Sequence, residues 1–261
     1  MKIRILGSGT SSGVPRIGGG GRGLDSGWGS CDQSDPRNYR TRASVLVSTL
    51  STRILVDTSP DMRAQLLAAA VNDVDAVIWT HDHADHCHGI DDLRQLYHAR
   101  GAPVAGYARP DTLAALERRF GYAFAGRGPY PPMVAGALLP NVVTIGDIVV
   151  RTVDQPHGDI TSAGLRFESA GTAIGYSTDF HEFTPEMHGN FSGLDIWVVD
   201  ALRRRPHPTH PHLAQVLQWI AELKPALAAL VHMDESMDYA TLAAELPAGI
   251  IPGYDGLELG E

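Results

Sequence analysis

The sequence contains few cysteines: Cys31 and Cys87 are the two present in 261 residues. Two cysteines this far apart cannot build a disulfide framework, and they lack the close spacing of a compact metal clip. We therefore expect both thiols to be reduced.

Long apolar runs are also missing. No segment approaches the roughly 18 consecutive apolar residues that a membrane span requires. Met1 and Lys2 lead directly into the apolar stretch Ile3–Leu6, which leaves no room for the basic and apolar regions of a signal peptide. We therefore expect a cytoplasmic protein that makes no membrane contact.

Basic residues are fewer than acidic ones: the sequence has 21 Lys and Arg against 30 Asp and Glu, which gives a net charge of −9. This balance opposes unassisted attraction to nucleic acid or to an anionic membrane. With 43% hydrophobic residues, the chain can still bury a substantial core. We expect residues 1–261 to form one large domain.

Apolar runs rich in β-branched residues alternate with helical patterns, which predicts a layered α/β fold. The predicted strands are Ile3–Leu6, Ser44–Val47, Ile54–Val56, Val74–Thr80, Ile148–Val153, Gly164–Phe167, Thr172–Tyr176, Leu194–Val199 and Ala226–Val231. One predicted helix follows the capping residue Ser59, with Pro60 in its first turn and Met62, Leu66, Leu67 and Ala70 on one face. Three others carry the apolar faces Leu93–Tyr97, Leu113–Phe120 and Leu213–Ile220.

Three segments fit no regular pattern. Residues 11–30 are rich in glycine and predict a long loop. Residues 121–140 combine glycines and prolines with aromatic residues; they are expected to form either a lid over a site or a packed surface excursion, with Tyr130 as a candidate substrate contact. The third segment, Arg203–Pro211, contains three consecutive arginines.

A cluster of metal-ligating residue types follows the predicted strand Val74–Thr80. The run His81-Asp82-His83-Ala84-Asp85-His86 would lie at a strand end, where α/β enzymes place their chemistry. His81 and His83 could face one ion, and Asp85 and His86 a second. A solvated polar loop is the alternative, although burying so many polar groups without a metal would be costly.

Three more polar residues follow apolar strands further along the chain. His157 comes after Ile148–Val153, Asp179 after Thr172–Tyr176, and His232 directly after Ala226–Val231. A lone histidine of this kind is more often a structural residue than a ligand. Together with the first cluster, however, these residues supply ligands for two divalent ions, Zn²⁺ or Mn²⁺.

The order of these residues resembles the ligand set of the metallo-β-lactamase superfamily, and the resemblance spans nearly the whole chain. It implies a four-layered αββα sandwich with a two-metal site at one edge of the sheets. By this resemblance, the first ion is held by His81, His83 and His157, the second by Asp85, His86 and His232, and Asp179 bridges them. True β-lactamases tend to have cysteine at the position of Asp179, whereas hydrolases of phosphodiesters, thioesters and lactones tend to have aspartate.

Asp57 follows the predicted strand Ile54–Val56. The resemblance, and the need of a ligand histidine for a partner on its other ring nitrogen, favour a hydrogen bond between Asp57 and such a histidine. The alternative is a helix-capping role before Pro60.

Within the superfamily, Leu6–Pro15 and Arg40–Ser44 resemble the phosphodiesterase branch, in particular the phosphoribosyl 1,2-cyclic phosphate phosphodiesterases of the carbon-phosphorus lyase pathway; ribonuclease Z shares parts of the pattern. The glycine-rich start could bring backbone N–H groups near a phosphate, although glycines also serve ordinary tight turns. Those phosphodiesterases carry a structural zinc site made of three cysteines and a histidine. This sequence retains only Cys31 and has Glu235 near the histidine position, so we expect that zinc site to be absent.

His210 aligns with an active-site histidine of these phosphodiesterases, which implies proton donation to the leaving oxygen. Asp85 is assigned a catalytic role along with its role as a ligand. Arg203 and Arg204 could attract a phosphate group, although a charge run is usually a solvated loop. His207 and His212 are expected to be solvated or capping residues.

The predicted reaction is attack on a small phosphate diester, cyclic ones included, by a hydroxide that two metal ions bridge. A thioester or lactone hydrolase is the alternative, because the same nucleophile attacks carbonyl carbon. Processing of tRNA 3′ ends is disfavoured, because residues 121–140 carry only Arg127 as a basic residue. The full ligand set argues against an inactive metal-binding scaffold. The expected partner is a small-molecule phosphate ester, and we also consider a homodimer.

Overall fold

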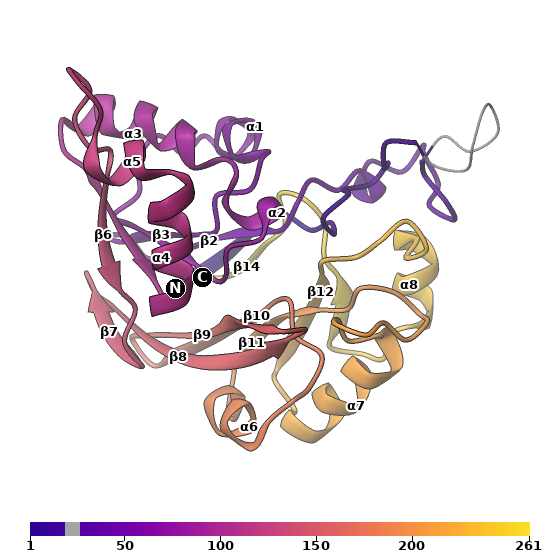
Figure 1. The fold of residues 1–261 in the computed structure, drawn as a ribbon. Coiled ribbons are helices and arrows are strands. Elements are labelled where there is room, and N and C mark those ends of the chain that lie inside the picture. Colours follow the sequence, from indigo (N-terminus) through magenta and orange to yellow (C-terminus); the bar gives the residue numbers. More distant parts are fainter. Residues whose placement is uncertain (19–26) are drawn as a thin grey trace.

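The computed structural model describes residues 1–18 and 27–261. Two seven-stranded sheets face each other, and helices cover the outer face of each (Figure 1). This is the four-layered αββα sandwich that the family resemblance implies.

Each sheet is formed by one half of the chain, with a single exception at the C-terminus. The first sheet has the order β14-β1-β2-β3-β4-β5-β6, with β14 at Glu258–Gly260, β1 at Lys2–Gly7, β2 at Ser44–Ser48, β3 at Arg53–Val56, β4 at Ala76–Trp79, β5 at Val104–Ala108 and β6 at Val134–Leu138. The second has the order β13-β12-β11-β10-β9-β8-β7, with β13 at Ile250–Pro252, β12 at Leu227–Val231, β11 at Ile196–Asp200, β10 at Thr172–Ser177, β9 at Ile160–Ser169, β8 at Ile148–His157 and β7 at Val142–Ile145. The last strand therefore returns the chain to the first sheet.

The two sheets repeat one pairing pattern that is not visible in the sequence. From β14 to β6, and again from β7 to β13, three antiparallel pairings are followed by three parallel ones. Strands β3 and β10 thus occupy equivalent places, each beginning the parallel part of its sheet. Asp57 follows β3 and Asp179 follows β10 one residue after Thr178, and both have left-handed backbone angles, with φ of 64° and 56°.

Three apolar clusters hold the layers together. The central cluster contains side chains of both sheets, including Ile54, Ile78, Phe167 and Val198, all fully buried. The first outer cluster packs the first sheet against its helices, which are α1 (Met62–Ala68), α2 (Ala84–Cys87), α3 (Leu93–Arg100), α4 (Pro110–Arg119) and α5 (Gly121–Ala125). The second packs the other sheet against α6 (Pro185–Phe191), α7 (Leu213–Leu223) and α8 (Tyr239–Glu245). Two short 3-10 turns, η1 (Pro36–Asn38) and η2 (Ile90–Asp92), complete the elements.

All nine predicted strands are present, with ends shifted by a few residues. The interpretation of residues 121–140 as irregular is wrong, because this segment contains α5 and β6, and β6 is an edge strand of the first sheet. Its prolines and glycines are confined largely to residues 126–132, and the flanking apolar residues pair with or pack on neighbouring elements. Strands β5, β7, β13 and β14 were not predicted either.

The predicted start of the first helix is also wrong. The helix begins at Met62 with Asp61 as its N-cap residue. The hydroxyl of Ser59 still accepts a hydrogen bond from the backbone N–H of Asp61 at 3.1 Å, as a capping residue does, and it donates to Gln65 Oε1 at 2.9 Å. Leu67, predicted to face the core, is 65% exposed. Part of the predicted loop of residues 11–30 lies outside the described residues; its described parts, 11–18 and 27–30, contain no helix or strand beyond an isolated bridge at Val14. Within the described part of the chain, no helix has the length and apolarity to cross a membrane.

Candidate metal centre

The histidine motif lies at the end of β4, where the chain leaves the first sheet. His81 follows Trp79 by two residues, and His83 has extended backbone angles at the start of α2. The single turn of α2 then carries Asp85 and His86. The extended backbone before α2 directs His81 and His83 to one side of the centre. The helical turn directs Asp85 and His86 to the other side, as the sequence predicts.

Residues from three other places in the chain converge on this motif. His81, His83, His157 and Asp179 can each offer a ligand atom within 4.8 Å of the others, and the same is true of Asp85, His86 and His232. His157 ends β8, while Asp179 and His232 follow β10 and β12. All seven predicted ligands therefore come together, in the two groups that the resemblance implies.

Asp179 lies between the two groups and presents one oxygen to each. Its Oδ1 lies 3.8 Å from His81 Nε2 and 3.6 Å from His157 Nε2. Its Oδ2 lies 3.1 Å from His86 Nε2 and 3.5 Å from His232 Nε2. This is the arrangement expected of a carboxylate that bridges two cations.

The donor atoms themselves fit metal ions. Among the described residues, the Nε2 atoms of His81, His86 and His232 are buried and have no hydrogen-bond partner. A buried polar atom left unpaired costs about 1–3 kcal/mol, so three at one centre indicate a missing partner. Imidazole nitrogens and carboxylate oxygens are ligands that suit Zn²⁺ and Mn²⁺.

The electrostatics of the centre also favour a cation. Burial lowers the pKa of His81 and of His157, which keeps these rings neutral and their lone pairs free. Burial alone would raise the pKa of Asp179, but the neighbouring imidazoles hold it well below its ordinary value, so the carboxylate is ionised. For His232, burial is outweighed by Asp179 and Asp200, which raise its pKa to about 9. Positive charge is therefore stabilised here, and a bound metal would displace protons from the centre.

Three of the candidate ligand histidines have an outer contact that orients the ring. The hydroxyl of Thr80 lies 3.0 Å from His81 Nδ1. Asp57 is fully buried, and its Oδ2 lies 2.7 Å from His86 Nδ1, which is the contact that the sequence predicts. Asp57 also accepts hydrogen bonds from the backbone N–H and the hydroxyl of Thr80. The backbone carbonyl of Thr209 lies 2.9 Å from His157 Nδ1. Such contacts fix the tautomer of a ligand histidine and raise its basicity.

Asp200, at the end of β11, belongs to the site and was not predicted. It is fully buried, and its Oδ2 accepts a hydrogen bond from the backbone N–H of Asp179 at 3.1 Å. The same oxygen lies 2.9 Å from His210 Nδ1, and Oδ1 lies 3.9 Å from His232 Nδ1. The sequence rule that identified the candidate ligands, a polar residue at the end of an apolar strand, also applies to Asp200. This residue directly follows the predicted apolar strand Leu194–Val199.

His210 lies beside the cluster. Its Nε2 is 3.8 Å from Asp179 Oδ1, and its ring stacks on that of His232 with centroids 4.9 Å apart. Its side chain is 12% exposed to solvent. Ligand atoms of His210, Asp179 and His232 also lie within 4.8 Å of one another, so the geometry allows His210 to act either as a ligand or as a proton donor.

Three residues predicted to bind substrate make other contacts. The side chain of Arg203 donates to the carbonyls of Arg205 and Pro206, and Arg204 forms an ion pair with Glu245 of α8 at 2.7 Å. Tyr130 lines a cavity of 510 Å³ whose lining includes none of the seven ligands. The structure therefore does not bring these three side chains to the histidine cluster.

Three backbone N–H groups of the glycine-rich start have partners within the protein. The N–H groups of Ser8, Gly9 and Thr10 donate to Asp255 Oδ1, to the carbonyl of Thr41 and to the carbonyl of Met233. A Cβ at Gly9 would lie 2.9 Å from Arg40 Cβ, so glycine serves a close backbone approach here.

The two cysteines and Glu235 make ordinary structural contacts. Cys31 Sγ accepts from the buried guanidinium of Arg40 at 3.6 Å, and Glu235 forms an ion pair with Arg16 at 2.8 Å. Cys87 is fully buried, with its thiol directed to the carbonyl of Asp82.

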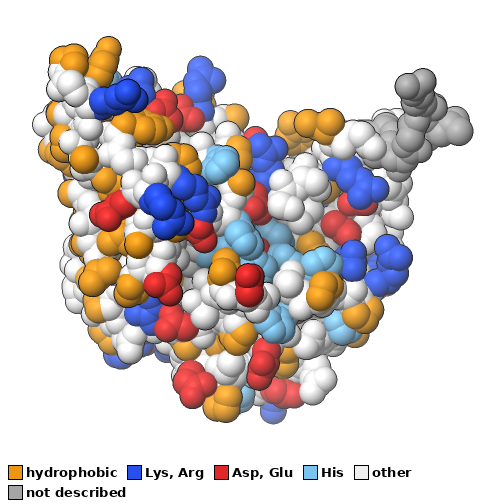
Figure 2. All heavy atoms as spheres, in the orientation of Figure 1, with side chains coloured by type: hydrophobic (Ala, Val, Ile, Leu, Met, Phe, Trp, Pro, Cys, Tyr) orange, Lys and Arg blue, Asp and Glu red, His pale blue; other side chains and the backbone are white. Residues whose placement is uncertain are grey.

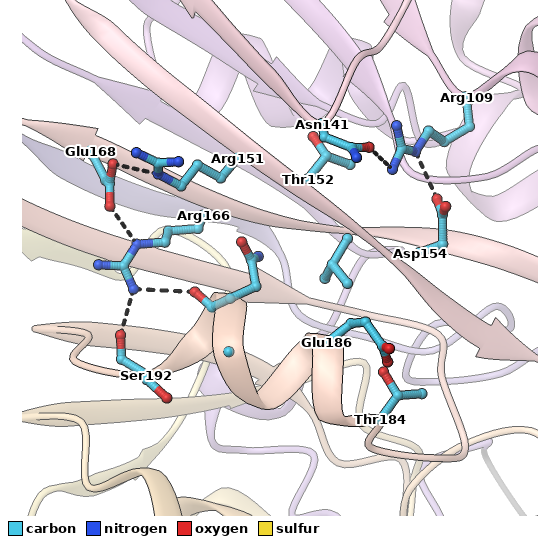
Figure 3. Close-up of a pocket in the computed structure, with 13 residues that line it drawn as sticks. Arg109, Asn141, Arg151, Thr152, Asp154, Arg166, Glu168, Thr184, Glu186 and Ser192 are labelled. Atoms are coloured by element: carbon cyan, nitrogen blue, oxygen red, sulfur yellow. Dashed lines mark hydrogen bonds and ion pairs between the residues drawn. The ribbon is translucent and has the colours of Figure 1, made fainter.

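Histidine side chains gather in a hollow on the face shown in Figure 2. A cavity of 540 Å³ is lined by Asp82 of the motif and by Asp159, two residues after His157, but by none of the seven candidate ligands. A larger cavity of 850 Å³ continues from it through the shared residues Arg109, Asn141 and Asp154 (Figure 3). In the larger cavity Arg109 pairs with Asp154, and both Arg151 and Arg166 pair with Glu168, so two carboxylates are shared by three guanidinium groups (Figure 3).

Comparisons with known proteins agree with this geometry. Residues 52–233 match the family model of the beta-lactamase superfamily domain. The chain is 32% identical over 268 residues to the octanoyltransferase of Porphyromonas gingivalis, an alignment that covers 99% of this chain and 51% of that protein. It is 30% identical over 141 residues to the ribonuclease Z of Bradyrhizobium diazoefficiens, which covers 52% of this chain and 47% of that enzyme. The chain thus spans about half the length of the curated relatives it matches.

Among solved structures, a diphosphatase from the PhnP family superimposes with a TM-score of 0.88 and 34% identity, over 99% of this chain and 97% of that one. The short form of human tRNase Z superimposes with a TM-score of 0.68 and 14% identity, over 100% of this chain and 99% of that one, which supports the fold alone. From the family match, the fold and the converging ligands, we conclude that the chain belongs to the metallo-β-lactamase superfamily of metal-dependent hydrolases and is structurally similar to a PhnP-family diphosphatase.

Proposed function

We propose that the protein is a two-metal phosphodiesterase that acts on small phosphate diesters, cyclic ones included. The observation that carries this proposal is the position of Asp179 between two groups of ligands, with His210 beside it. A cytoplasmic location, Zn²⁺ or Mn²⁺ as the metal, and a homodimer remain predictions.

The ligand assignment follows the two groups. His81, His83 and His157 would hold one ion, Asp85, His86 and His232 the other, and Asp179 would contact both. When bound, a pair of divalent ions lowers the pKa of a water molecule and neutralises charge on phosphoryl oxygens.

His210 is the group we assign to the leaving oxygen. Its Nδ1 lies 2.9 Å from Asp200 Oδ2, so the carboxylate can accept a hydrogen bond from Nδ1–H and fix the orientation of the ring. The Nε2 proton, on the side nearer Asp179, is then available for the departing alkoxide. Asp200 also accepts from the backbone of Asp179, which fixes the donor relative to the bridging carboxylate.

The cavity lined by Asp82 of the histidine motif has room for a small substrate. Its 540 Å³ is within the range that holds small molecules, about 300–1,000 Å³. The names of two similar proteins, a diphosphatase and a ribonuclease Z, support chemistry at phosphorus.

The proposal is tested with protein loaded with Zn²⁺ or Mn²⁺. We expect hydrolysis of bis(p-nitrophenyl) phosphate and of a cyclic nucleoside phosphate, and we would run a diphosphate, a thioester and a lactone in parallel. Turnover confined to the thioester or the lactone would refute the phosphodiesterase assignment and favour the acyl hydrolase alternative.

The role of His210 has its own test. We expect His210→Ala to lower kcat by about 10²- to 10⁴-fold, because a positioned general acid contributes a factor of that size. Metal content, measured by elemental analysis, should stay unchanged, and His188→Ala on α6 is the matched control. Loss of metal in His210→Ala would instead make His210 a ligand.

A further inference from the structure

The loop that carries His210 is closed at its base by the backbone. The N–H of Leu202 donates to the carbonyl of Pro211 at 3.1 Å, and the N–H of Leu213 donates to the carbonyl of Arg203 at 2.9 Å. Arg203 and His212 form an isolated bridge between the two ends. Residues 204–211 therefore form a loop whose two ends lie side by side.

Inside this loop, side chains replace the missing backbone bonds. Among the described residues, no backbone–backbone hydrogen bond involves residues 204–210, and Pro206, Pro208 and Pro211 have no N–H to donate. The guanidinium of Arg203 supplies donors in their place, since its Nε donates to the carbonyl of Arg205 at 3.2 Å and its Nη2 to that of Pro206 at 2.9 Å. The fork of donors on one planar group suits two neighbouring carbonyls.

The far side of the same loop faces the metal centre with two consecutive residues. The carbonyl of Thr209 lies 2.9 Å from Nδ1 of the ligand His157. His210 Nδ1 lies 2.9 Å from Asp200 Oδ2, and the rings of His207 and His210 are in contact, with centroids 5.1 Å apart. The path of residues 204–208 therefore sets where Thr209 and His210 lie.

We propose that Arg203 is a positioning residue for the reaction: by binding the carbonyls of its own loop, it holds His210 and the carbonyl of Thr209 against the metal centre. This assignment replaces the sequence-based expectation that Arg203 binds the substrate phosphate, and it rests on the proposed function of His210. Loosening the loop would let His210 move away from the leaving oxygen, and a misplacement of about 1 Å can cost two orders of magnitude in rate.

The test compares Arg203→Ala with Arg205→Ala, which removes the same charge from the same loop but leaves the Arg203 side chain in place. We expect Arg203→Ala to lower kcat by about 10- to 100-fold with KM unchanged, and Arg205→Ala to have no effect. The loss should be larger for a diester with an alkyl leaving group than for bis(p-nitrophenyl) phosphate, because a poor leaving group depends more on the proton from His210. A rise in KM alone would overturn the proposal in favour of direct substrate binding.

Two further measurements complete the test. The first distinguishes positioning of His210 from a general structural effect, and the second does not depend on the proposed activity. In a His210→Ala background, Arg203→Ala should cost less than about threefold, because residues that act through one another are not additive; additive losses would overturn the proposal. In the zinc-loaded protein, Arg203→Ala should shift or broaden the imidazole NMR signals of His157 and His210, whereas Arg205→Ala should not. If the wild-type protein hydrolyses none of the esters, the proposed function fails; the NMR comparison still decides the role of Arg203, and unchanged imidazole signals would refute it.

Discussion

At the scale of single residues, three side chains of the metal centre sit on left-handed backbone. Asp57, Asp179 and His232 have φ of 64°, 56° and 57°, and each comes within two residues of the end of a buried strand. Non-glycine residues rarely adopt this region, and such strain tends to concentrate at functional sites. Here the sharp turn directs each side chain back to the centre as the chain leaves the sheet.

Asp57 gives a test of the outer contacts. We expect Asp57→Asn to weaken metal binding by about 10- to 100-fold, because His86 loses the carboxylate that orients its ring and raises its basicity. Competition with a chromophoric chelator measures the affinity. Asp75→Asn, an exposed position before β4, serves as the control. Equal affinities of both variants and the wild type would contradict a role for Asp57 at the metal.

At the scale of elements, Asp238 connects α8 to the loop before β2. As the N-cap residue of α8 it accepts hydrogen bonds from the N–H and hydroxyl of Thr241, and it also accepts from Asn38 Nδ2 and the N–H of Asp32. Burial would raise the pKa of Asp238, but these hydrogen bonds hold it well below the ordinary 3.8.

The direction of this shift fixes a pH dependence. Because the folded-state pKa lies below that of the unfolded chain, the unfolded chain binds the proton more tightly, and stability rises with pH across that interval. The contribution is present above pH 3.8 and is lost as the pH falls toward the folded-state pKa. We therefore expect Asp238→Asn to lower the free energy of unfolding by about 1 kcal/mol at pH 7, a value kept small by solvent screening, and by less at pH 3, in urea titrations. An equal difference at both pH values would show that the charge of Asp238 is not involved.

At the scale of the whole molecule, the two sheets share one core. Ile54 and Ile78 of the first sheet belong to the same buried cluster as Phe167 and Val198 of the second. Neither sheet can bury its inner face without the other, which supports the prediction that residues 1–261 form one domain.

Phe167→Ala tests this shared core. Phe167 lies on β9 and is fully buried, so we expect the substitution to cost about 3–5 kcal/mol. If both sheets unfold together, calorimetry should give one transition for the wild type and one for the variant, with the variant's at lower temperature. Two separated transitions would mean that the halves of the chain unfold as independent units.

Local sequence patterns were enough to predict nine strands and the seven candidate ligands. Both depend on neighbours in the chain, because a buried strand is an apolar run and a polar residue at its end is visible from the next few positions. Asp200 carries the same signal, so it could have been found by applying the rule to every strand.

The other features became visible only in the folded molecule, because they depend on contacts between residues far apart in the chain. β6 is a strand because β5 lies beside it, although its segment is interrupted by glycine and proline. The three consecutive arginines look alike in sequence, yet Arg203 binds its own loop and Arg204 binds Glu245 of α8. A charged side chain takes whichever partner the folded backbone places within reach, and that placement is fixed by packing between layers and not by neighbours in the sequence.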